Sequence, residues 1–486
     1  MPHLPENPSL EHLRRQARTL LRQFRAADAE ALALLREHHP RPHEPLRLAD
    51  AQLVVARSYG FASWPALRRH MDVVGRFARS PHTVPPSPDA ADELLRLGCV
   101  RYGGDSRADQ ARAVALLAER PELSGASLYT AAATGDVAAA RAFLGRDPAA
   151  ANRPGGPFGW EPLLYLAYSR IGGDALPVAR LLLDHGADPN AGYLWEGTYP
   201  FTALTGAFGG GEDRGNQPPH PQGLALARML LEAGADPNDS QALYNRQFEP
   251  DDGHLRLLIE FGLGTDRGGP WHRLLHSYHG TPAHLLEDQL SAAAQFDRPG
   301  WARLALAAGA DPDGCGTAQP VLHGRTPYET AVHRGNLEVA ELLRAAGAAA
   351  PAVADVDAFL MTCLAGDRAG AEQSRAADPG IVDRARARRP DAVLTAVEVG
   401  RASAVQLLVD LGFDVHAGHR ITPLHQAAYD GDVELVALLL ELGADPARRD
   451  HSFNATPLGW AEHNHQQAAV ELLRSVTPAD ANPPSR

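Results

Sequence analysis

The sequence contains no lysine, so all 46 of its lysine-plus-arginine residues are arginines. Arginine cannot replace the titratable amine that forms a Schiff base, nor the compact ammonium group that binds nucleotide phosphates in a Walker A loop. The composition therefore excludes enzymes that depend on a Schiff-base lysine, on a pyridoxal-phosphate anchor or on a Walker A lysine.

Cysteine and long apolar stretches are also scarce. The three cysteines, Cys99, Cys315 and Cys363, lie far apart and form no CxxC pair, which excludes a disulfide scaffold and a cysteine-rich zinc site. No stretch approaches the roughly 18–20 apolar residues that span a bilayer, and the first residues lack the apolar run of a signal peptide. We expect a cytoplasmic protein with no membrane partner.

The chain has few positive charges relative to its negative ones. Acidic residues outnumber basic ones, 59 to 46, and the formal net charge is −13. Because such a surface repels phosphate backbones, we expect no nucleic-acid partner. The alternative is an arginine-dependent nucleic-acid contact near the start of the chain, through Arg14, Arg15, Arg18, Arg22 and Arg25. Glu30, Glu37 and the mixed spacing of the charges favour an ordinary solvated surface instead.

A repeated helical unit occupies most of the chain. The unit that starts at Thr422 reads TPLHQAAYDGDVELVALLLELGADP, and the next starts 34 residues later at Thr456 with TPLGWAEHNHQQAAVELLRSV. Thr422 suits a helix N-cap, Gly431 and Asp432 suit a tight turn into a second helix, and Gly443 suits that helix's end. The pattern predicts helical hairpins that bury their apolar residues by stacking on neighbours.

Further copies of the second helix begin at five other positions: Leu176, Leu224, Trp301, Leu337 and Ala404. These residues resemble the ankyrin repeat, whose pattern is TPLHxA, a Gly-Asp or Gly-Asn turn, and an apolar helix that ends in GADP. The resemblance implies an all-α solenoid of stacked helical hairpins, with about ten units, and a role in protein recognition. It also implies that His425 bridges neighbouring loops through hydrogen bonds and has no catalytic role.

The sequence predicts four regions. Residues 1–79 have helical periodicity without GADP ends and are expected to form a small helical domain. Within it, YGFASWPALRRH resembles a helical segment that precedes ankyrin arrays in bacterial proteins. Residues 80–89 are a proline-rich linker, residues 90–476 are the repeat array with irregular central repeats, and residues 477–486 are a disordered tail.

Departures from the repeat pattern point to candidate binding residues. The finger NAGYLWEGTYPFTAL carries Tyr193, Trp195 and Tyr199 around Glu196, and exposed aromatic residues in a finger are candidate anchors for a partner. The alternative is that these rings pack on the adjacent finger as local core.

A second departure is GGGEDRGNQPPHPQ, which replaces the usual two-residue turn between the helices of one unit. Loops of this length in compact repeats are often functional, and Asn216 and His220 are candidates for hydrogen bonds to a ligand. The spacing does not match a phosphate-binding loop, because Glu212 and Asp213 stand where phosphate would lie.

The next first helix carries large polar side chains, Gln241, Tyr244 and Asn245, where small residues are usual. If neighbouring repeats share a concave surface, these residues and Trp195 are expected to line one pocket.

A third departure, TDRGGPWHRLLHSYHGTPAH, places Trp271, His272 and His276 on a stretched interval between units. The two histidines are four residues apart and would share a helix face. Zinc sites usually need three or four ligands in a fixed pattern, and none is present, so we expect no metal and no cofactor.

The first interpretation is a protein-binding scaffold or regulator that holds a protein partner in its concave groove and finger loops. The chain has no GxSxG elbow and no nucleophilic cysteine motif. The alternative is an enzyme or a small-molecule-binding protein with a pocket formed by the irregular repeats at about residues 190–284.

Overall fold

Capped, regularly spaced apolar segments form helices throughout the part of the chain that the computed structural model describes, residues 9–42, 45–275, 280–317 and 325–478. These residues contain 28 α-helices, three 3-10 helices and three short strands, so the prediction of an all-α repeat protein is confirmed. The chain divides into two compact units. Unit 1 comprises residues 1–208, 220–242 and 267–279, and unit 2 comprises residues 209–219, 243–266 and 280–486.

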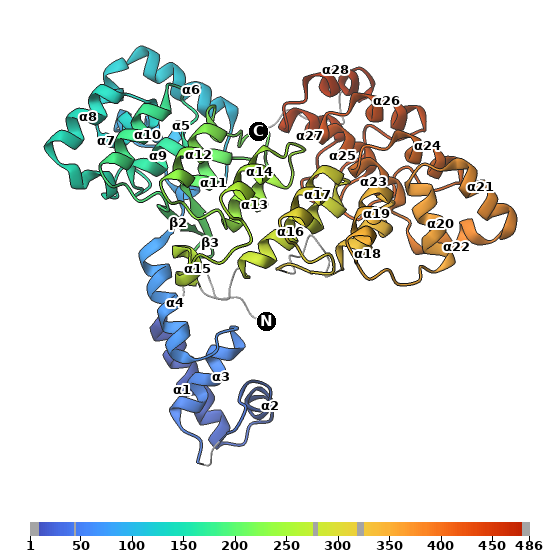
Figure 1. Cartoon of the computed structure of the whole chain (residues 1–486), viewed down its shortest axis with the longest axis horizontal. Coiled ribbons are helices and arrows are strands. Elements are labelled where there is room, and N and C mark those ends of the chain that lie inside the picture. The colour runs from blue at the N-terminus through green and yellow to red at the C-terminus, as the bar shows by residue number, and fades with distance from the viewer. Residues whose placement is uncertain (1–8, 43–44, 276–279, 318–324, 479–486) are drawn as a thin grey trace. The chain divides into compact units, whose positions relative to one another are not determined.

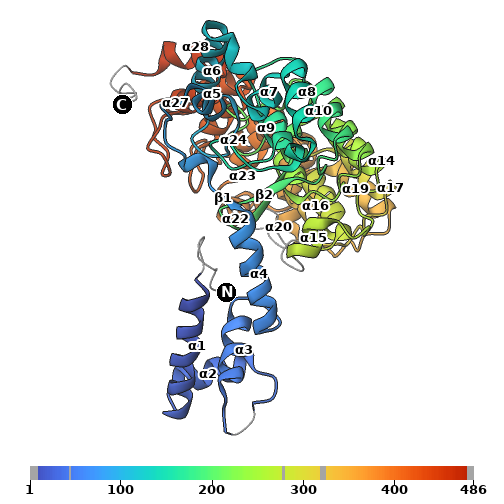
Figure 2. The same ribbon diagram turned by 90° about the vertical axis from the view of Figure 1, so that its left-hand side faces the viewer.

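Unit 1 begins with four helices that pack on one another (Figure 2). They are α1 (Leu10–Arg25), α2 (Ala29–His38), α3 (Leu48–Ser58) and α4 (Trp64–Phe77). Their shared core contains the buried Leu13, Phe24, Val54 and Leu67. The side chain of Ser9 accepts a hydrogen bond from His12 N and caps the first turn of α1, which supports this helix start.

Four helical hairpins follow in unit 1. They are α5 (Ala90–Gly98) with α6 (Arg107–Glu119), α7 (Leu128–Thr134) with α8 (Val137–Arg146), α9 (Pro162–Tyr168) with α10 (Ala175–Asp184), and α11 (Ala203–Phe208) with α12 (Gly223–Glu232). The first helices contact one another in sequence order, as do the second helices α8, α10 and α12. Three 3-10 turns, Pro81–Thr83, Pro121–Gly125 and Pro148–Asn152, join these parts.

A small sheet interrupts the helical pattern of unit 1. The finger between α10 and α11 is an antiparallel hairpin of β2 (Gly192–Trp195) and β3 (Tyr199–Thr202), in which Trp195 pairs with Tyr199. The two-residue strand β1 (Ala78–Arg79), directly after α4, adds to β2 in parallel. The short α15 (Pro270–Leu275) packs Leu275 against Val74 of α4 and Leu194 of β2.

Unit 2 contains six further hairpins, coloured from yellow to red in Figure 1. They are α16 (Pro282–Gln295) with α17 (Pro299–Ala307), α18 (Pro327–Arg334) with α19 (Leu337–Ala345), α20 (Asp355–Leu364) with α21 (Arg368–Ala377), α23 (Ala392–Glu398) with α24 (Ala402–Asp410), α25 (Pro423–Asp430) with α26 (Val433–Glu441), and α27 (Pro457–His463) with α28 (Gln467–Val476). The helices α14 (Gly253–Glu260) and α22 (Ile381–Arg388) belong to the same unit, and α13 (Ser240–Arg246) spans the division at residue 242.

The TPLH unit folds as its residue types require. Thr422 and His425 form a capping box at the start of α25, and Gly431 ends that helix with a φ of 74° in the left-handed region. His425 is buried, and its Nε2 lies 3.1 Å from the carbonyl oxygen of Ala455 in the next finger. Burial lowers the pKa of His425, which fits a neutral bridging ring.

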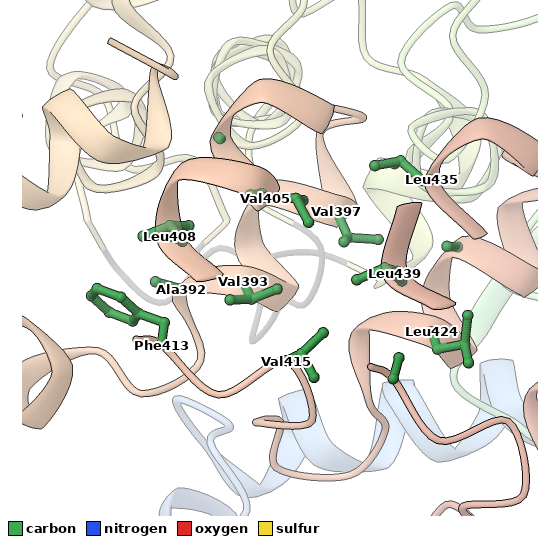
Figure 3. Packing of buried hydrophobic residues seen from close by; sticks show 14 of the residues in the cluster. Ala392, Val393, Val397, Val405, Leu408, Phe413, Val415, Leu424, Leu435 and Leu439 are labelled. Atoms are coloured by element: carbon green, nitrogen blue, oxygen red, sulfur yellow. The ribbon is translucent and has the colours of Figure 1, made fainter. Parts of the chain in front are cut away.

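One core cluster of unit 2 runs through its hairpins from Phe359 on α20 to Leu473 on α28. Figure 3 shows Val393 and Val397 of α23 next to Val405 and Leu408 of α24. Leu439 of α26 lies beside Val397. Each hairpin thus covers the apolar surface of the preceding one, as a stacked-repeat fold requires.

Candidate functional site

The aromatic finger of unit 1 carries Tyr193 and Trp195 on β2 and Tyr199 on β3. Tyr193 is 2% exposed, and its ring stacks on Trp160 with the ring centroids 5.0 Å apart. Burial raises the pKa of the Tyr193 hydroxyl. Tyr193 is therefore part of the local core and does not lie on a surface that a partner reaches.

The other finger residues are partly accessible. Trp195 is half-buried, and its indole N–H donates to the carbonyl oxygen of Arg101 at 3.2 Å. Glu196 has a left-handed φ of 50°, and its carboxylate lies 3.9 Å from Nε2 of His82. Tyr199 is 47% exposed, which makes it the predicted finger residue most open to solvent.

A small pocket lies beside this hairpin. Its lining includes Asn190, Thr202, Asp236, Asp239, Trp271 and His272, all in unit 1. The indole N–H of Trp271 donates to the carbonyl oxygen of Asn190 at 3.0 Å and closes one side. The pocket has a volume of about 30 Å³, enough for a water molecule but far below the few hundred Å³ of an organic ligand.

Asp239 is the chemically unusual group of this pocket. Its buried carboxylate accepts hydrogen bonds from the hydroxyl groups of Thr202 and Thr205 and, at 2.9 Å, from the backbone N–H of Ala242. Burial raises its pKa to about 6 despite these donors. Thr202 and Thr205 occupy the positions that Thr422 and His425 hold in the regular unit, so Asp239 replaces the histidine bridge to the next repeat. The half-buried Gln241 follows in the first turn of α13.

The long turn at residues 209–219 is an ordered part of unit 2. Inside it, Gly210 N–H donates to the carbonyl oxygen of Gln217 at 2.8 Å. The buried Asn216 donates through Nδ2 to Asp213 Oδ1 at 2.9 Å, and its Oδ1 lies 2.8 Å from Nε2 of His465. The predicted ligand contact Asn216 is thus satisfied within the chain.

The same turn, which we call the bridging segment, contacts the C-terminal ends of α25 and α27. Arg214 pairs with Asp430 at 2.6 Å, and its guanidinium carbon lies 5.0 Å from the ring centroid of Tyr429. Asp213 Oδ1 lies 3.0 Å from Nε2 of His463, and this carboxylate raises the pKa of the histidine. In the sequence, Asp213 served only as an argument against a phosphate site, and these contacts were not predicted.

Two further predicted residues, Tyr244 and Asn245, meet the bridging segment. The Tyr244 hydroxyl donates to Glu212 at 2.5 Å, and the carbonyl oxygen of Asn245 accepts from Gly211 N–H at 3.0 Å. His220 lies in unit 1, where burial lowers its pKa to about 3. His276 lies outside the described residues. Trp195 belongs to unit 1 and Tyr244 to unit 2, so a pocket lined by both stays a prediction.

The finger of the last repeat contains the most exposed aromatic residue of the described chain. Phe453 is 75% exposed. The buried Asp450 carboxylate accepts from the backbone N–H groups of Ser452 and Phe453, both at 2.6 Å, and of Ala455 at 2.9 Å. It also accepts from the Trp460 indole at 3.0 Å. This finger was not predicted, although an aspartate in a loop commonly accepts a hydrogen bond from the backbone N–H two residues later.

Within the described residues, the structure lacks both a metal-binding cluster and a membrane-spanning helix. No group of three or more His, Cys, Asp or Glu side chains lies close enough to hold a metal ion. No helix in the described ranges is both long and apolar enough to cross a membrane.

Comparison with known proteins agrees with the repeat pattern. A family model described as ankyrin repeats (3 copies) matches residues 378–484, which contain the hairpins α23–α24, α25–α26 and α27–α28. No curated protein matches the chain. The chain therefore contains ankyrin repeats at residues 378–484.

Proposed function

We propose that this protein is a scaffold or regulator that binds a protein partner through the fingers and inner helices of its C-terminal ankyrin repeats. Ankyrin repeats are generally protein-interaction modules. The observation that carries the proposal is Phe453, a large apolar side chain that the finger of the last repeat holds out to solvent.

The finger is preorganised for contact. Asp450 fixes three backbone N–H groups of the fingertip, so Phe453 would lose little conformational freedom on binding. An aromatic side chain on a rigid support supplies contact area at low entropic cost, which is the common property of energetic hot spots at interfaces.

Aromatic rings connect this fingertip with the inner helices. The ring centroid of Phe453 lies 5.9 Å from that of Trp460 on α27, and Trp460 lies 5.7 Å from Tyr429 on α25. Trp460 and Tyr429 are both half-buried. A partner segment on Phe453 can therefore extend along the Trp460 ring to the inner helix α27, up to Tyr429, which the bridging segment already contacts. This supports the predicted use of the finger and the inner helices together.

The predicted alternative, an enzyme or a small-molecule-binding protein, gains no support from the pocket beside the aromatic finger. Its volume of about 30 Å³ admits water only. The hydrogen bonds of Asp239 go to Thr202, Thr205 and Ala242, which is the role of a structural bridge between repeats.

Site-specific photocrosslinking tests the proposal. The photoreactive residue p-benzoylphenylalanine replaces Phe453 in the full chain, expressed in the cells from which the protein comes. The matched control replaces Leu337, which is 46% exposed on the second helix α19, away from any finger. We expect one predominant protein adduct from position 453, identified by mass spectrometry, and none of that mass from position 337. The same adduct pattern at both positions, or no adduct at position 453, would overturn the proposal.

A further inference from the structure

The N-terminal helices differ in charge from the rest of the chain. Residues 1–79 contain 13 arginines and 8 acidic residues, whereas residues 80–486 contain 33 arginines and 51 acidic residues. A basic region in an otherwise acidic protein indicates a local electrostatic function and not a general requirement for solubility.

The arginines of α1 form a surface of their own. Leu13, Ala17, Leu20 and Phe24 are the buried residues of this helix. Arg14, Arg18, Arg22 and Arg25 recur at intervals of three or four residues, so they lie together on a different side of the helix, and Arg15 lies beside them. All five arginines are exposed. We call these five residues the arginine face.

The arginine face has no carboxylate partner in the described part of the chain. Its polar contacts are those of Arg15 with His12 at 3.0 Å and of Arg22 with Thr19 at 3.1 Å. Elsewhere arginines pair with acidic side chains, as Arg96 does with Glu93 and Arg401 with Asp297.

The nearby carboxylates have other roles. Asp28 caps α2 by accepting from Ala31 N–H at 2.9 Å, and Asp50 accepts from Arg47 N–H at 2.7 Å and contacts His39. None of the described carboxylates of the first four helices is in ion-pair contact with the arginine face.

A groove of about 390 Å³ adjoins the arginine face. Side chains of α1, α2 and α3 line it, among them Arg15, Thr19, Leu34 and Ser58. Its volume lies in the range of about 300–1,000 Å³ that is usual for ligand sites. Leu34 is 38% exposed, so the groove offers apolar surface, and Arg15 belongs both to the groove and to the arginine face.

We infer that α1 and this groove bind an acidic, amphipathic protein segment. Its carboxylates would pair with Arg15, Arg18 and Arg22, because the planar guanidinium group donates two parallel hydrogen bonds to a carboxylate. Its apolar side chains would enter the groove against Leu34, which is how amphipathic helices bind grooves in general. The arginine face belongs to unit 1 and the C-terminal fingers to unit 2, so the inference does not depend on the function proposed for the fingers.

The groove favours a peptide over a nucleic acid. A phosphate backbone would use the arginine face but would gain nothing from the exposed apolar side chain of Leu34. The acidic remainder of the chain also repels a long polyanion more strongly than it repels a short peptide.

Fluorescence anisotropy with the full chain tests the inference with three labelled probes. The first is an amphipathic helical peptide with glutamates on one side and leucines on the other. The second has lysines in place of the glutamates, and the third is a DNA duplex of about 20 base pairs. We expect the glutamate peptide to bind at least about tenfold more tightly than either other probe, and salt to weaken its binding.

Variants locate the contact. The triple change Arg15→Glu, Arg18→Glu and Arg22→Glu is expected to abolish binding of the glutamate peptide, and Leu34→Ala to weaken it several-fold. The control Arg141→Glu, Arg180→Glu and Arg375→Glu changes the net charge equally at exposed sites on α8, α10 and α21 and should leave binding unchanged. Arg→Gln versions of the first triple guard against misfolding, which circular dichroism detects.

Three outcomes would overturn the inference. They are tighter binding of the duplex than of the glutamate peptide, equal loss in the control triple, and no binding of the peptide to the folded wild-type chain.

Discussion

Asp213 and His463 are separated by 250 positions in the sequence, and their side chains meet at 3.0 Å. Together with Arg214 and Asp430, they fix the bridging segment on the C-terminal ends of α25 and α27. The bridging segment, which departs from the repeat pattern in the sequence, thus binds to the last two repeats of the same chain. This arrangement explains why residues 209–219 are grouped with unit 2 although the helices that flank them belong to unit 1.

The first prediction concerns the pH dependence of this contact. Asp213 raises the pKa of His463, so the protonated ring stabilises the bound segment. The contribution is fully present below the unfolded pKa of about 6.5 and is lost as pH rises through the folded value. NMR titration of His463 should show a lower pKa in Asp213→Asn than in the wild type. An unchanged pKa in this variant would contradict the contact.

A second prediction concerns the fingertip that presents Phe453. Asp450→Ala removes the acceptor of four hydrogen bonds and should weaken the local structure by about 2 kcal/mol. Hydrogen exchange at Ser452, Phe453 and Ala455 measures the effect directly. The control is Asp414→Ala in the preceding finger, where an exposed aspartate should leave exchange at Phe453 unchanged.

Two tyrosines of one finger should respond differently to substitution. Tyr193 packs on Trp160 in the core of unit 1, so Tyr193→Ala should destabilise that unit by about 3–5 kcal/mol. Tyr199 is 47% exposed, and Tyr199→Ala should change stability by less than about 0.5 kcal/mol. Urea unfolding followed by tryptophan fluorescence compares them. Equal effects would show that the two side chains are buried to the same extent.

The raised pKa of Asp239 predicts a pH-dependent difference in stability between Asp239→Asn and the wild type. Burial raises its pKa to about 6 from 3.8, so its contribution to stability is complete below about pH 4 and is lost as pH rises through 6. In Asp239→Asn this loss is absent. Relative to the wild type, the variant should gain up to about 3 kcal/mol between pH 4 and pH 7.

Hydrogen exchange at Leu204 and Thr205 in α11 measures this difference. The matched control is Asp184→Asn, at an exposed position on α10, which should show the same pH dependence as the wild type. A constant difference between Asp239→Asn and the wild type across this pH range would mean that Asp239 titrates normally.

Local residue patterns predicted the hairpins because TPLH, Gly-Asp and GADP determine helix ends within a few residues of themselves. Thr422, Gly431 and Asp432 act as predicted. The same patterns cannot distinguish Tyr193 from Tyr199, because burial of Tyr193 depends on Trp160, which precedes it by 33 residues in another finger. Strand β1 has only two residues, Ala78 and Arg79, and therefore carries no periodicity that a sequence reading can detect.

The candidate site was less predictable than the fold for the same reason. Long-range packing determines the partners of Asp213, Arg214 and Tyr244, so the local sequence does not predict them. Phe453 was not predicted because its exposure depends on the turn that Asp450 stabilises. From the sequence alone, an apolar residue in a loop could equally be exposed or buried in the core.

The bridging segment has a consequence for how the molecule unfolds. A solenoid whose repeats contact only their neighbours loses them one by one from a free end, because each step breaks one local interface. Here the last two repeats also hold a segment that is more than 200 positions away in the chain, and closing that loop is slow and entropically costly. The C-terminal end is therefore expected to resist fraying and to complete its folding late, in a cooperative step that ordinary linear arrays lack.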